Sequence, residues 1–183
     1  MGALLGASRA IDAVNGWIGR AVSWLVLLAI LVSAGNAIIR WVSPAHSSNA
    51  WLELQWYLFS AVFLLAAAYT LLKGEHVKVD ILYSRWSRRT QIWIEIFGII
   101  AFLMPFCVIS MIYSWPEVAS RYHSGEMSGN PGGLIRWPVW ALIPAGFLLL
   151  GLQGLSELIK RIAILSGRIP DIVEAHGHEA DPL

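Results

Sequence analysis

Charge is scarce in this sequence. Only 14% of its 183 residues are Asp, Glu, Lys or Arg, whereas 57% are hydrophobic. Soluble domains carry about 25% charged residues, and long apolar runs are typical of membrane spans. The net charge of +1, without a stripe of Lys and Arg among aromatic residues, gives no indication of a nucleic-acid partner. The composition therefore excludes an ordinary soluble domain and predicts an integral membrane protein.

Groups that carry enzyme chemistry are also missing. The only cysteine, Cys107, lies inside an apolar run, so no disulfide can form within the chain. The sequence has no Ser/His/Asp, Cys/His, CxxC or phosphate-loop pattern, and its five histidines all lie outside the apolar runs. A haem-bearing membrane anchor would instead place histidines on facing helices. We therefore expect a protein that is not an enzyme, with no catalytic residue, cofactor or metal site of its own.

No apolar run has an ionisable side chain near its middle. Such a residue costs at least about 2.5–3.5 kcal/mol at the bilayer centre, and it commonly marks a proton relay or an ion pathway. Glu53 and Glu95 stand where two of the runs begin, and Glu157 stands just beyond the end of the last one. This pattern argues against a cation-coupled transporter made by this chain alone.

What the sequence does have is four long apolar runs. A helix needs about 20 such residues to cross roughly 30 Å of hydrocarbon. The sequence therefore predicts an all-α integral membrane protein with four transmembrane helices, at residues 21–39, 54–72, 96–115 and 137–156. Pro105 and Pro144 are expected to kink the third and fourth helices, whereas Pro138 falls in a first turn, where proline is tolerated.

Two further segments have the pattern of amphipathic helices on the membrane surface. Residues 3–20 have apolar residues at helical spacing but are too polar to cross a bilayer, and residues 81–92 mix basic with aromatic residues. A mobile N-terminal tail and a plain basic loop are the alternatives. We expect residues 1–162 to form one membrane domain and residues 163–183 to be a polar, disordered tail.

The distribution of basic residues predicts the orientation. Ten of the 13 Lys and Arg residues lie in the N-terminal segment, the loop between the second and third spans, and the C-terminal tail. The other two loops hold only three. Since cytoplasmic loops are enriched in Lys and Arg, both termini should be cytoplasmic and residues 116–136 should form an outer loop.

The order of these features resembles the small permease subunit, the Q or DctQ-type subunit, of TRAP transporters (tripartite ATP-independent periplasmic carriers). One part of the similarity is the polar start of the second span, Glu53-Leu54-Gln55. Another follows that span, where the H-V-x-V-D pattern of the family is matched by Glu75-His76-Val77-Lys78-Val79-Asp80. The four spans with both ends inside are a further point of similarity. The resemblance covers about residues 15–162.

Further runs are similar to one subgroup of this family, associated with α-keto acids, mannitol or chloroaromatic compounds. These runs are Asn130-Pro131-Gly132-Gly133, followed by Arg136-Trp137-Pro138, and Leu152-Gln153-Gly154 with Glu157. The transported compound itself cannot be read from a subunit that is not expected to contact it.

The resemblance implies a non-catalytic subunit in the inner or cell membrane of a bacterium or archaeon. In the family, a large multi-span permease subunit binds sodium and an organic acid and moves by an elevator mechanism. A periplasmic binding protein delivers the substrate, and the small subunit enlarges the immobile scaffold. The expected partners are therefore the large permease subunit, the binding protein and membrane lipid, with sodium held only by the large subunit.

The same resemblance suggests roles for polar residues. Residues expected to orient helices or contact the large subunit are Glu53, Gln55, Glu75, His76 and Asp80. Candidates for docking of the binding protein are Glu117, Arg121, Glu126, Asn130 and Arg136. Two other hypotheses remain open: a self-sufficient homo-oligomeric four-span transporter or channel, and a membrane anchor for a redox enzyme.

Overall fold

The computed structural model describes residues 2–43, 48–74 and 86–170. Four helical segments in this part are long and apolar enough to cross a membrane, and the predicted all-α membrane protein with four such helices is confirmed. Which side of the membrane the termini face stays a prediction. The elements are α1 (Gly2–Val42), α2 (Asn49–Lys73), α4 (Arg88–Gly98), the π-helix η2 (Ile99–Leu103), α5 (Met104–Ser124) and α6 (Trp137–Leu165).

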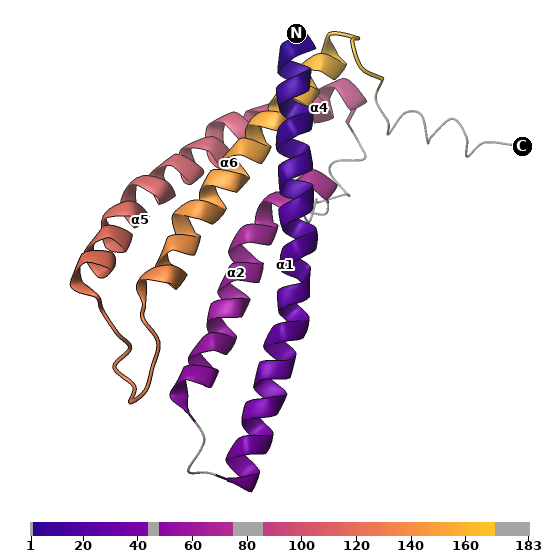
Figure 1. Cartoon of the computed structure of the whole chain (residues 1–183). Helices are drawn as coiled ribbons and strands as arrows, with labels where there is room; N and C mark the ends of the chain where they lie inside the picture. The colour runs from indigo at the N-terminus through magenta and orange to yellow at the C-terminus, as the bar shows by residue number, and fades with distance from the viewer. Residues whose placement is uncertain (1, 44–47, 75–85, 171–183) are drawn as a thin grey trace, which may run out of the picture.

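Helix α6 is the centre of the bundle. It packs against α1, α2 and α5, and its last turns also contact α4. In Figure 1 it lies between α5 and the pair formed by α1 and α2. The N-terminus, α4 and the end of α6 lie together at what we call the terminal end. The end of α1, the start of α2 and the α5–α6 loop (residues 125–136) lie at the opposite, loop end.

Small residues allow the helices to approach closely. Gly146 of α6 lies against the backbone of Leu64 in α2, where an added Cβ would be 2.7 Å from the Leu64 carbonyl oxygen. Gly19 of α1 lies against the ring of Tyr69 in α2. In lipid, helix association depends on such close packing because the surrounding hydrocarbon is as apolar as the helices themselves.

Helix α1 is a single helix of 41 residues, with no break near residue 20. The sequence predicted an amphipathic surface helix over residues 3–20 that leads into the first span, and in the structure this segment is continuous with that span. Two of its polar residues, Ser8 and Asn15, are buried and form hydrogen bonds with α6. How deeply this half of α1 sits in a bilayer stays a prediction.

The third membrane segment has an irregular turn next to Pro105. The π-helix η2 ends at Leu103, two residues before it, and the N–H of Met104 donates to the carbonyl of Ile99. Proline has no N–H, and its ring collides with the carbonyl four residues earlier, so a wider turn relieves the collision. The disturbance predicted at Pro105 thus takes the form of a π-turn. The described helix α4 begins at Arg88; residues 81–85 of the predicted surface helix lie outside the described residues.

Helix α5 is longer than the sequence suggested. It continues through Pro116 to Ser124, so Glu117 and Arg121 are helical residues and not part of the loop expected over 116–136. The salt bridge between these two side chains, four residues apart, supports the extra turns. The loop that remains is short, from residue 125 to residue 136.

Candidate functional site

At the loop end, one buried carboxylate connects α2 to the α5–α6 loop. Glu53 lies in the second turn of α2 and only 4% of it is exposed. Its carboxylate accepts hydrogen bonds from the Ser128 hydroxyl, from Asn130 Nδ2 at 2.9 Å and from the Leu134 backbone N–H at 2.6 Å. A buried carboxylate is costly unless its oxygens are hydrogen-bonded, and here both oxygens are.

Other contacts fasten the same loop to α2. Asn49 Nδ2 donates to the Pro131 carbonyl at 3.0 Å, and the Tyr57 hydroxyl donates to the Ile135 carbonyl at 2.9 Å. Within the loop, the N–H of Ser128 bonds to the Leu134 carbonyl at 3.0 Å. The α5–α6 loop is therefore folded onto the first turns of α2.

The charged residues of the loop end pair with one another. Arg121 forms salt bridges with Glu117 and with Glu126, and Arg136 lies 3.7 Å from Glu126. The guanidinium carbon of Arg121 also lies 3.7 Å from the centre of the Trp140 ring. The structure thus brings all five predicted docking residues to the loop end. Four of them are engaged in these ion pairs, and the fifth, Asn130, bonds to Glu53.

Of the five predicted helix-orienting residues, two lie in the described part of the chain. Gln55 lines a cavity of about 270 Å³ between α1 and α2, together with Ala29 and Phe59. Glu53 contacts the loop, as described above. Outside the described residues lie Glu75, His76 and Asp80.

At the terminal end, a second polar cluster joins α1 to α6; we call it the Asp12 cluster. Asp12 accepts hydrogen bonds from the Ser156 hydroxyl at 2.6 Å and from Gln153 Nε2 at 2.8 Å, and it forms a 3.1 Å salt bridge with Lys160. Asn15 Nδ2 donates to Gln153 Oε1 at 2.8 Å. Lys160 also pairs with Glu157, which completes the cluster.

Asp12 precedes the span predicted at residues 21–39. Both of its carboxylate oxygens have partners, since Oδ1 accepts from Ser156 and Gln153 and Oδ2 accepts from Lys160. Asp12 was not among the site residues predicted from the sequence. A signal was present, because Ser8, Asp12 and Asn15 are spaced four and three residues apart and so share one helical face.

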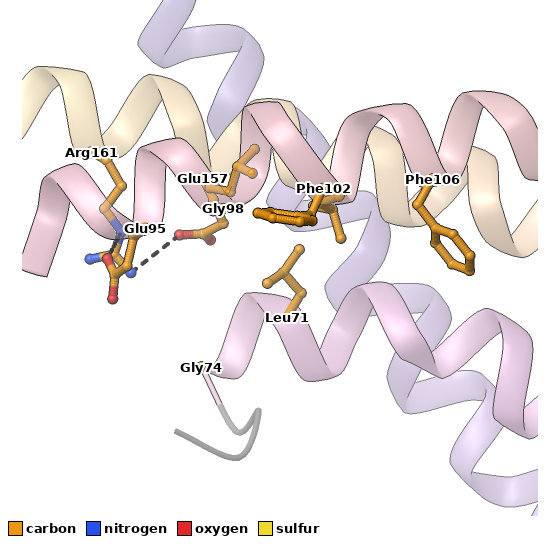
Figure 2. Close-up of a pocket in the computed structure, with 10 residues that line it drawn as sticks. Leu71, Gly74, Glu95, Gly98, Phe102, Phe106, Glu157 and Arg161 are labelled. Atoms are coloured by element: carbon orange, nitrogen blue, oxygen red, sulfur yellow. Dashed lines mark ion pairs between the residues drawn. The ribbon is translucent and has the colours of Figure 1, made fainter. Parts of the chain in front are cut away.

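Beside this cluster lies a largely apolar cavity of about 570 Å³. Figure 2 shows Arg161 between Glu95 and Glu157 at one end of it, with Leu71, Phe102 and Phe106 further along. Arg161 Nε is 2.8 Å from Glu95 Oε2, and its terminal nitrogen is 3.8 Å from Glu157 Oε2. The charges at this end of the cavity thus form one ion pair between α4 and α6 and one within α6.

Neither cluster has the geometry of a catalytic or metal site. In the described part of the chain, no group of three or more His, Cys, Asp or Glu side chains could hold a metal ion. The polar groups of both clusters instead fasten helices and a loop to one another. The fold and these clusters define a multi-pass membrane protein whose polar groups stand near the two ends of its helix bundle.

The comparison with protein families identifies this class more closely. The family model described as the DctQ component of tripartite ATP-independent periplasmic transporters matches residues 29–163. The chain therefore belongs to the DctQ family and is a small membrane subunit of a TRAP transporter. No curated protein and no solved structure matched the chain. The family resemblance predicted from the sequence is confirmed, while the subgroup stays a prediction.

Proposed function

We propose that this chain is the non-catalytic scaffold subunit of a TRAP transporter in the inner membrane, with both termini cytoplasmic. It holds a large elevator-type permease subunit, which performs sodium-coupled uptake of an organic acid delivered by a periplasmic binding protein. The observation that carries the proposal is the DctQ family match over most of the chain. The resemblance to the family supports an organic acid as the substrate class.

The distribution of polar groups supports a scaffold role. Within the described residues, Glu53 bonds to a loop, and Asp12, Glu95 and Glu157 bond or pair with their neighbours at the terminal end. A transport pathway for an ion would need such groups near the bilayer centre, facing a route through the protein. Large apolar side chains such as Phe63 and Tyr113 are exposed along the helices, where lipid or a membrane partner can cover them.

Reconstitution tests this function. Proteoliposomes that contain this chain and the large subunit, with loaded binding protein outside and an inward sodium gradient, are expected to take up the organic acid. Omission of any one of the three proteins, or collapse of the sodium gradient, should reduce uptake to the level of empty vesicles. Uptake by this chain alone would contradict the proposal and favour the self-sufficient homo-oligomeric transporter or channel.

A further inference from the structure

Within the described residues, the hydrogen bonds of Glu53 all go to one short stretch of chain. The three donors belong to Ser128, Asn130 and Leu134, which lie within the α5–α6 loop. None of them comes from another helix. What this carboxylate holds in place is thus the path of the loop over the start of α2.

The site is specific for a carboxylate. Oε1 accepts from both Ser128 and Asn130, and Oε2 accepts from the Leu134 N–H. All these partners act as donors toward Glu53, so an amide side chain would direct an N–H₂ group at one of them. Replacement of Glu53 by glutamine therefore leaves a partly buried donor without an acceptor unless the Ser128 hydroxyl and the Asn130 amide turn to accept from the new N–H₂ group.

The loop also leaves no space around the carboxylate. A Cβ on Gly133 would lie 2.9 Å from each Glu53 oxygen and 2.5 Å from the Cβ of Ser128. These contacts are too short for any residue other than glycine unless the loop moves. The backbone of the loop at Gly133 is therefore packed directly against the Glu53 carboxylate, and this close packing restricts the path of the loop.

A loop of this composition would be flexible without such a support. Residues 125–136 include four glycines and one proline and carry little regular structure beyond a single bridge between Met127 and Ile135. If a flexible loop became ordered only when a partner docked, the lost conformational freedom would weaken binding. A loop that is already ordered avoids this loss.

We infer that Glu53 is a positioning residue that holds the α5–α6 loop in one shape before the periplasmic binding protein docks at the loop end. The inference rests on the proposed function, because that function supplies the partner. It also assigns the ion pairs among Arg121, Glu126 and Arg136 to the same task, since they brace the two helix ends from which the loop departs.

The test uses the reconstituted three-protein system and varies the concentration of loaded binding protein. We expect Glu53→Ala to raise the KM for the binding protein about tenfold, with the maximal uptake rate within twofold of the wild type. Ser128→Ala should raise it less, and it should have no further effect in a chain that already carries Glu53→Ala. Ser60→Ala is the matched control on α2, because the Ser60 hydroxyl bonds only to the carbonyl of Trp56 in its own helix.

The outcomes separate the two claims. If the wild-type system shows no uptake that depends on the binding protein, the proposed function itself fails. If the wild type transports but Glu53→Ala keeps the wild-type KM, the positioning role is wrong. Co-purification with the large subunit is measured for each variant, and a loss of assembly in both Glu53→Ala and Ser128→Ala would assign Glu53 to subunit assembly and overturn the inference.

Discussion

Gly146→Ala is expected to force α2 and α6 apart and to destabilise the protein strongly. The new Cβ would lie 2.7 Å from the carbonyl oxygen of Leu64 and 3.0 Å from its carbonyl carbon. Backbone atoms cannot rotate away as a side chain can, so the helices themselves must move. Overpacking of this kind costs about 1–3 kcal/mol, which corresponds to a melting temperature about 2–12 °C lower in a chain of this size.

The control for this prediction is Gly35→Ala in α1. Gly35 is also helical, but no atom lies within 4 Å of the position of its added Cβ. Alanine favours a helix more than glycine does, by about 1 kcal/mol in a helix interior, so this variant should melt at or slightly above the wild-type temperature. Thermal unfolding of the detergent-purified proteins compares the two. Equal melting temperatures would mean that Gly146 does not set the distance between α2 and α6.

Asp12→Ala is expected to release the N-terminal half of α1 from α6. The change removes the shorter of the two bonds that Ser156 and Gln153 each donate, and one of the two carboxylates that pair with Lys160. Buried polar groups that lose their partners cost about 1–3 kcal/mol each, so we expect a total loss of about 2–4 kcal/mol after partial hydration. Local opening of the N-terminal half of α1 should follow, because these bonds are among those that fasten it to α6.

Limited proteolysis measures this release directly. Trypsin should cut after Arg9 and Arg20, which are both exposed, at least several-fold faster in the Asp12→Ala variant than in the wild type. Asp12→Asn, which keeps an acceptor oxygen, should fall between the two. Ser23→Ala is the matched control in α1, because the Ser23 hydroxyl bonds only to the Arg20 carbonyl of its own helix. Cleavage of Asp12→Ala at the rate of Ser23→Ala would show that the Asp12 cluster does not hold α1.

The sequence predicted those features that depend on local composition. A helix must be apolar over about 20 residues to cross a bilayer, so the runs without charge are enough to locate four membrane helices. Pro105 was likewise a local signal for an irregular helix, although not for a π-turn. The sequence shows which backbone hydrogen bond a proline removes. The form that the helix then takes depends on the helices packed around it.

Other features depend on contacts between distant segments and could not be predicted in this way. Two of the polar residues that made residues 3–20 look like a surface helix, Asp12 and Asn15, bond to α6, more than 130 residues away. The Gly, Ser and Pro content of residues 116–136 suggested a loop over the whole stretch, although α5 continues to Ser124 and includes the local pair Glu117–Arg121. Asn130 was predicted to be free for docking, because its partner Glu53 lies in α2, 77 residues away, and the sequence does not show that the two meet.

The position of Glu53 has a consequence for the surrounding lipid. From Glu53 to Lys73, α2 is about 30 Å long at 1.5 Å per residue, which equals the thickness of a typical hydrocarbon core. A lone helix adapts to a thinner or thicker bilayer by tilting or sliding. Here the loop is bonded to the start of α2 and Gly146 holds α6 beside it, so sliding would break those contacts. The subunit should therefore impose a constant hydrophobic height on its neighbours, and the lipid would have to stretch or compress to match it.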